Sequence, residues 1–138
     1  MEDKSKDVDL IIPMIPEMEL TASNTAEAVG EFMKLDHDKI QEIKLALIEA
    51  CINAFEHSQS QDERVNISFE MGENELTIQI SDQGQGFDLK RAQEELKKRR
   101  QRGERMRGWG LTIMRELMDE VEVESDENGT TITMKKQR

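Results

Sequence analysis

A chain of 138 residues with 36% hydrophobic side chains has the size of one domain and can form one modest core. Its formal net charge of -11 and its isoelectric point near 4.7 argue against a nucleic-acid binder, because a polyanion would be repelled by most of its surface. The single cysteine, Cys51, excludes an internal disulfide and fits a reducing cytoplasm. The N-terminus is acidic and its apolar stretch is interrupted by Pro13 and Pro16, which indicates neither a signal peptide nor a membrane span.

The N-terminal part is predicted to be a loose tail followed by an extended strand and a helix. Residues 1–7 are polar, and Val8–Leu20 has the apolar content of an entry strand, broken or edged by its two prolines. Ser23 or Asn24 is a candidate N-cap for a first helix that ends near Leu35. The apolar residues expected to recur on the buried face of this helix are Ala28, Val29, Phe32 and Met33.

The strongest helical pattern of the chain follows, with Asp36 or Asp38 as its candidate cap. Beyond the polar run 58–63, the segments Val65–Met71 and Leu76–Ile80 alternate between apolar and polar residues, which predicts an antiparallel hairpin with one face on the core. The second helix is predicted from an apolar stripe at near-3.6 spacing, formed by Ile40, Ile43, Leu47, Ile48, Cys51, Ala54 and Phe55.

The C-terminal part restarts the core pattern after a glycine-bearing segment. A helix is expected from Leu111 to Met118, a strand at Val121 and Val123, and a last strand over Thr131–Met134. The order of strand, two helices, hairpin, variable segment, helix and hairpin predicts an α/β two-layer sandwich with helices on one face of a mostly antiparallel sheet. We expect residues 1–138 to form a single domain.

The second predicted helix carries three polar residues that could address one ligand. Glu49, Asn53 and His57 are spaced i, i+4 and i+8, which places them on one narrow stripe of the helix. An amide oxygen is a suitable ligand for Mg²⁺, and a carboxylate one turn away could orient or deprotonate a nucleophile. The spacing alone is equally satisfied by a solvated helix face.

A second signal directly follows the predicted hairpin. Asp82, Gly84 and Gly86 form a D-x-G-x-G pattern after an apolar strand. Glycines allow the main chain to approach a flat ring closely, and a buried carboxylate can accept a hydrogen bond from an exocyclic amine. The alternative is a plain turn.

A third signal lies at the start of the C-terminal helix, where Arg107, Gly108, Trp109, Gly110 and Leu111 follow one another. Unpaired amides at a helix N-terminus, made accessible by glycine, are a natural seat for phosphate. A hinge into an ordinary helix is the alternative.

The basic residues are concentrated just before this helix. Lys90–Arg107 carries nine of the 19 basic residues of the chain and only three acidic ones. Such a segment is either a solvated helix face or a flap over an anionic ligand.

Taken together, the three signals resemble the motifs of GHKL ATPases, which have the Bergerat fold. IEACINAFEHS resembles the N-box, SDQGQGFD resembles the G1 box, and RGWGLTIMRELMDEVEVES resembles the G2 box. The last stretch and the chain length are similar to those of the anti-sigma-factor serine kinases, and the resemblance extends over residues 18–135. The family often carries an arginine on its first helix that touches protein partners, whereas residues 21–35 contain none here.

The resemblance implies a cofactor and a set of residue roles. Mg²⁺ and ATP would be bound, with Asn53 as the metal ligand and Glu49 as the general base toward the hydroxyl that is phosphorylated. Asp82 would accept from the adenine amino group. Residues 88–107 would form the ATP lid. The further nucleotide contacts that it implies are His57, Gly84, Gly86, Arg107, Gly108, Gly110, Leu111 and Thr130.

The resemblance also implies the reaction and the partners. The γ-phosphate of ATP would be transferred to a serine or threonine of an anti-anti-sigma protein, and a sigma factor would be sequestered by this chain, which would act as a cytoplasmic homodimer. A non-catalytic module that binds ATP and sequesters a partner is the alternative function. An acidic α/β interaction domain without any nucleotide is a third.

Overall fold

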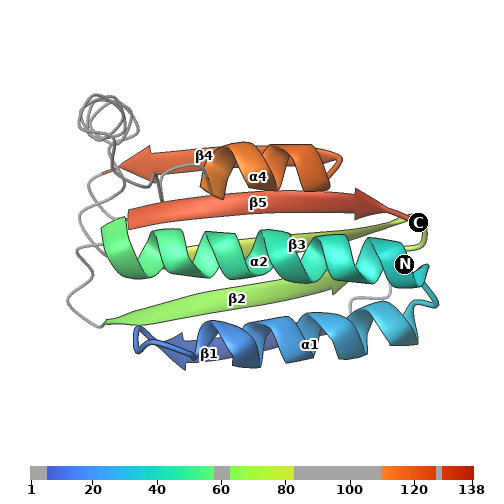
Figure 1. Cartoon of the computed structure of the whole chain (residues 1–138), viewed down its shortest axis with the longest axis horizontal. Coiled ribbons are helices and arrows are strands. Elements are labelled where there is room, and N and C mark those ends of the chain that lie inside the picture. Colours follow the sequence, from blue (N-terminus) through green and yellow to red (C-terminus); the bar gives the residue numbers. More distant parts are fainter. Residues whose placement is uncertain (1–5, 58–62, 83–109, 127–128) are drawn as a thin grey trace.

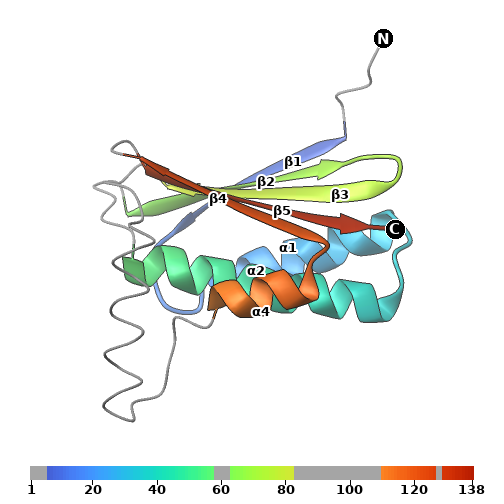
Figure 2. The ribbon, with the colours of Figure 1, turned by 90° about the horizontal axis from the view of Figure 1, so that it is seen from above.

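The computed structural model describes residues 6–57, 63–82, 110–126 and 129–138. Five described strands form one sheet in the order β1-β2-β3-β5-β4, and every neighbouring pair is antiparallel (Figure 1). Figure 2 shows that the described helices lie together on one face of this sheet. The predicted two-layer sandwich is therefore confirmed. The elements in chain order are β1 (Asp7–Pro13), α1 (Glu19–Phe32), α2 (His37–His57), β2 (Arg64–Met71), β3 (Glu75–Asp82), α4 (Gly110–Leu117), β4 (Glu120–Asp126) and β5 (Gly129–Gln137).

The N-terminal strand is shorter than its apolar content predicted. β1 pairs with β2 from Asp7 to Pro13, so Asp7 belongs to the sheet and not to a loose tail. Proline cannot donate a ladder hydrogen bond, and Pro13 is accommodated because it is the last residue of an edge strand. The chain then turns at Glu17, which has a positive φ of 82°, and α1 begins two residues later.

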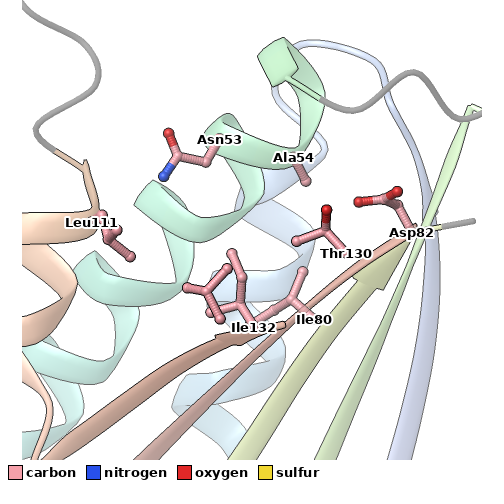
Figure 3. Close-up of a pocket in the computed structure, with 8 residues that line it drawn as sticks. Asn53, Ala54, Ile80, Asp82, Leu111, Thr130 and Ile132 are labelled. Atoms are coloured by element: carbon pink, nitrogen blue, oxygen red, sulfur yellow. The ribbon is translucent and has the colours of Figure 1, made fainter. Parts of the chain in front are cut away.

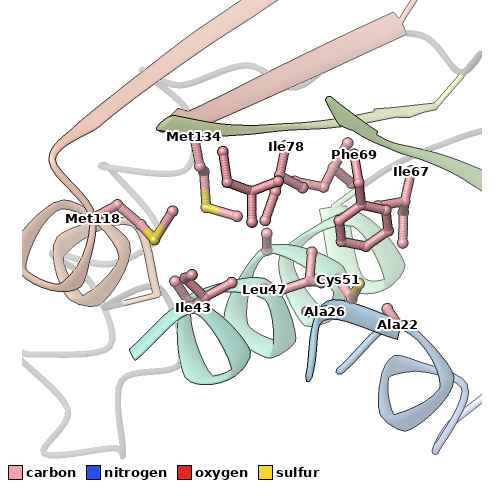
Figure 4. Packing of buried hydrophobic residues seen from close by; sticks show 14 of the residues in the cluster. Ala22, Ala26, Ile43, Leu47, Cys51, Ile67, Phe69, Ile78, Met118 and Met134 are labelled. Atoms are coloured by element: carbon pink, nitrogen blue, oxygen red, sulfur yellow. The ribbon is translucent and has the colours of Figure 1, made fainter. Parts of the chain in front are cut away.

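The predicted hairpin of β2 and β3 is confirmed. Ile67 faces Ile80 and Phe69 faces Ile78 in the register of the pair. These four side chains are buried and point toward the helices, while the residues between them lie on the other face of the sheet. Figure 4 shows how the core is filled between the two layers, with side chains from the sheet meeting those of α1, α2 and α4.

The first helix begins earlier than its predicted cap. Ser23 is 3% exposed inside α1, and the N-cap position is Met18, which makes no side-chain capping hydrogen bond. Phe32, expected on the buried face, is 68% exposed. Ala28, also expected there, is exposed, whereas Val29 and Met33 are buried as predicted. Small residues complete the buried face, because α1 lies close to α2: a Cβ added at Gly30 would be 2.7 Å from Cγ1 of Ile40. The small buried residues of α1 are Ala22, Ser23, Ala26 and Gly30.

The second helix follows its prediction closely. Asp36 directly precedes α2, and its carbonyl accepts the hydrogen bond of the Ile40 amide at 3.0 Å, as expected of a capping position. Most of the predicted stripe is buried, while Ile48 and Phe55 are half-buried. α2 is the longest helix described, yet no helix in the described ranges is long and apolar enough to cross a membrane.

The single cysteine is a core residue, as its apolar surroundings predicted. Cys51 is fully buried on α2, in the core shown in Figure 4. Burial, and secondarily the negative charge of Glu19, raises the pKa of this thiol from 9.0 to about 12. Cys51 is therefore an unreactive thiol at neutral pH.

Candidate nucleotide-binding site

One pocket opens at the end of the sheet where β3 ends and β5 begins. The space between its lining residues is about 390 Å³, part of which is open solvent. Two helices and three strands contribute to it, so residues far apart in the sequence meet there (Figure 3). The lining residues are Asn53 and Ala54 of α2, Ile80 and Asp82 of β3, Leu111 of α4, Val123 of β4, and Thr130 and Ile132 of β5.

Asp82 and Thr130 form one polar end of the pocket. The two residues are direct partners in the register of β3 and β5, and they are 8% and 6% exposed. Figure 3 shows their side chains next to each other at the mouth of the pocket. A buried carboxylate beside a hydroxyl offers hydrogen-bond acceptors and one donor to a flat polar ring. The family resemblance assigned Asp82 to adenine recognition and Thr130 to a further nucleotide contact.

Ser125 is a polar neighbour of this end that the sequence did not reveal. It faces Thr130 in the register of β4 and β5, and the two side-chain hydroxyls are 3.1 Å apart and hydrogen-bonded. Asp82, Thr130 and Ser125 thus stand abreast on three adjacent strands. The position of Ser125 could have been found only with the pairing of β4 and β5 in hand.

Asn53 supplies the second polar end. It is 8% exposed, and Figure 3 places its amide on the side of α2 toward Leu111, across the pocket from Asp82. Glu49 lies one turn earlier on α2 and is half-buried, and it is not one of the residues that line the pocket. The two polar ends, with an apolar strip between them, suit an elongated ligand with a ring at one end and charge at the other.

The apolar strip between these ends was also missed from the sequence. Ile80 stands two residues before Asp82, and Ile132 stands two residues after Thr130, so each pair shares one face of its strand. The alternation of apolar and polar residues with a period of two was therefore the available sequence signal for Ile80 and Ile132. Ile80 and Ile132 were indistinguishable from core residues because local alternation does not show where a sheet is left uncovered.

Several predicted nucleotide contacts are not tested by the structure. Gly84, Gly86, Arg107 and Gly108 lie outside the described residues, as does the predicted lid over residues 88–107. The side chain of His57 is also outside the description, although the residue ends α2. Gly110 is the first residue of α4, and Leu111 lines the pocket.

The donor set is consistent with a Mg²⁺ ion that is shared with a nucleotide. Among the described residues, no group of three or more His, Cys, Asp or Glu could hold a metal ion by itself. Mg²⁺ is commonly bound through one or two protein oxygens, with phosphate oxygens and waters completing its shell. The buried amide of Asn53 at the pocket wall fits such a role.

Comparison with known proteins identifies the family of the chain. Residues 15–136 match the family described as the histidine kinase-like ATPase domain. The chain belongs to this family. It is 33% identical to the serine-protein kinase RsbW of Bacillus velezensis over 94% of this chain and 84% of that protein. It is 39% identical to the anti-sigma F factor of Clostridium beijerinckii over 72% of this chain and 71% of that protein.

The fold of this chain also recurs in a solved structure. The RsbU and RsbW domains of a Mycobacterium tuberculosis protein align with a TM-score of 0.71 at 18% identity, over 96% of this chain and 33% of that chain. The predicted fold and the predicted kinship with anti-sigma-factor serine kinases are confirmed by these comparisons. The expectation of a protein serine kinase that uses ATP is confirmed at the level of the family.

Proposed function

We propose that this chain is a Mg²⁺-dependent serine kinase that binds a sigma factor and phosphorylates the protein that antagonises this binding. The observation that carries the proposal is the pocket itself, in which Asp82 with Thr130 and Asn53 beside α4 form two separate polar ends. The names of the relatives, serine-protein kinase and anti-sigma F factor, support both halves of the proposal.

The nucleotide is proposed to lie along the pocket with its adenine ring at the Asp82 end. The carboxylate of Asp82 would accept from the adenine amino group, and the apolar side chains of Ile80 and Ile132 would contact the ring. The triphosphate would then extend toward Asn53 and the first turn of α4, where unpaired helix amides favour negative charge. Gly84, Gly86 and Gly108 are proposed to complete the site, with Arg107 and His57 as further contacts.

Phosphoryl transfer is proposed to depend on three features of this end of the pocket. Asn53 would hold the Mg²⁺ ion, which neutralises charge on the phosphate oxygens when bound. The α4 amides of Gly110 and Leu111 would orient the phosphates. Glu49, one turn from Asn53 on α2, would accept the proton of the serine or threonine hydroxyl as that oxygen forms its bond to the γ-phosphorus. The bond between the γ-phosphorus and the β,γ-bridging oxygen would break in the same step, with ADP as the leaving group.

The physiological consequence is proposed to be partner exchange. The unphosphorylated antagonist would compete with the sigma factor for this chain, and phosphorylation would release the antagonist, so that the sigma factor is bound again. We further propose that the chain acts as one domain, with residues 88–107 as the lid, and that it works as a homodimer in the cytoplasm.

The direct test is transfer of labelled phosphate. Purified protein is incubated with γ-labelled ATP, Mg²⁺ and candidate antagonists encoded beside it, and labelled serine or threonine is identified in the antagonist. Label on the antagonist supports the proposal. Tight ATP and partner binding without any transfer would instead favour the non-catalytic module that binds ATP and sequesters a partner.

A further inference from the structure

Lys136 is a buried cation far from the pocket. It is 6% exposed near the end of β5, six residues beyond Thr130, which corresponds to about 20 Å along a strand. Its Nζ donates to Oε2 of Glu42 on α2 at 2.8 Å and to the backbone carbonyl of Leu117, the last residue of α4. One side chain therefore ties β5, α2 and α4 together.

Stability alone is a weak explanation for a charge at this position. The side chain of Lys136 is 8% exposed and that of Glu42 is 40% exposed, so the ammonium group loses most of its hydration while the carboxylate keeps part of its own. Because burying an ion is unfavourable, a well-packed apolar side chain of similar volume is often no less stabilising than such a charge. The ammonium group instead fixes the relative position of two helices, because it donates to the C-terminal carbonyl of α4 and to a carboxylate of α2 at the same time. Two further hydrogen bonds fix this end of α4 to β5: the Asp119 amide donates to the Lys135 carbonyl at 2.9 Å, and the Gln137 amide donates to Oδ2 of Asp119 at 2.6 Å.

The other end of α4 is where this anchoring matters. α4 has eight residues, so it is about 12 Å long, and it is too short to hold its place without tertiary contacts. A tilt of about 5° about Leu117 would move the first turn of α4 by about 1 Å. Misplacement of about 1 Å between reacting groups can cost on the order of 10² in rate.

Glu42 and Asn53 connect the anchor to the site along α2. They are eleven residues apart, which is about three helical turns, so both lie on the side of α2 that borders α4. We propose that Lys136 is a positioning residue: by fixing the C-terminal end of α4 against Glu42, it sets the distance between the first turn of α4 and Asn53, where the phosphates are held. This inference rests on the proposed ATP site.

The test compares Lys136→Met with Lys135→Met. Lys135 is the neighbouring lysine, it lies on the opposite face of β5, and its Nζ is 3.8 Å from Glu120. ATP affinity, adenosine affinity, single-turnover transfer and thermal unfolding are measured for both variants. We expect Lys136→Met to lower ATP affinity and transfer about tenfold or more, with adenosine affinity within about twofold of wild type, because adenosine has no phosphates to place against α4. Lys135→Met should leave ATP affinity, adenosine affinity and transfer unchanged.

Equal losses of ATP and adenosine affinity in Lys136→Met would overturn the inference, because they would indicate a general disturbance of the pocket. Transfer equal to that of Lys135→Met would overturn it as well. If Lys136→Met does not fold, Glu42→Gln decides: this side chain is partly exposed, and we expect a smaller loss for ATP with none for adenosine, whereas unchanged ATP affinity and transfer would refute the role. Failure of the proposed function would appear differently, as absence of ATP binding by the wild-type protein.

Discussion

Replacing Asp82 with asparagine should weaken nucleotide binding through a single atom. Asp82 is 8% exposed and stands beside Thr130 in the pocket, so a ligand group bonded to it would be largely removed from water. Asparagine keeps the side-chain volume but can present an NH₂ donor where the adenine amino group needs an acceptor. An unsatisfied buried polar group costs about 1 to 3 kcal/mol, which corresponds to roughly 5-fold to 150-fold in affinity.

The assay is calorimetric titration of Asp82→Asn with MgATP and MgGTP, beside unfolding measurements. Asp9→Asn is the matched control, because it makes the same chemical change at an exposed position of β1. We expect the control to bind both nucleotides as wild type does, and Asp82→Asn to lose most of its preference for ATP over GTP. Wild-type ATP affinity with an unchanged preference would refute the adenine role and leave Asp82 as the last residue of β3 without a part in nucleotide recognition.

Three further outcomes follow from the same geometry. Asn53→Ala should fold normally but lose the Mg²⁺ dependence of ATP binding, and titration with and without Mg²⁺ that still shows wild-type affinities would remove Asn53 as a metal ligand. Thr130→Val keeps the shape of a residue that is 6% exposed and removes its hydroxyl, so ATP affinity should fall by about 1 kcal/mol; unchanged affinity would place the hydroxyl outside the contact. The pKa of Cys51 is about 12 in the folded state and 9.0 ordinarily, so its contribution to stability is present below pH 9 and is lost as pH rises toward 12. In denaturant titrations, the unfolding free energy of wild type relative to Cys51→Ala should therefore decrease between pH 9 and pH 12. A constant difference over this range would contradict the burial argument.

The elements that sequence predicted best are those whose burial is visible as local periodicity. β2 and β3 alternate cleanly, and α2 carries its apolar stripe over about four turns, so their types and faces were predictable. The start of α1 was not predictable in this way, because Ala22 and Ala26 are small residues that become buried only through the close approach of α1 to its neighbours. Likewise, the pairing of β5 rather than β4 with β3 is a long-range choice that no local pattern records.

The residues of the candidate site also fall into those that a local motif contains and those that only the folded structure reveals. Asn53, Asp82 and Leu111 each belong to one of the three motifs that the sequence analysis singled out, and the structure brings them to one pocket. Thr130 was predicted through resemblance, and the structure gives it a physical place beside Asp82. Ser125 depends on strand pairing, and Lys136 on the meeting of three elements, so neither could be recognised before the fold was known.

The central claim, that the chain transfers phosphate and does not merely bind ATP, is tested most directly by single-turnover transfer from pre-bound ATP to the antagonist in wild type and Glu49→Gln. Glutamine keeps the side-chain volume but cannot accept the serine proton. We expect transfer by the wild type and a rate lower by roughly 10² to 10⁴ in the variant, with ATP and antagonist binding retained. A variant rate within a few-fold of wild type would remove Glu49 from catalysis, and absence of transfer by the wild-type protein to every antagonist that it binds would contradict the kinase assignment itself.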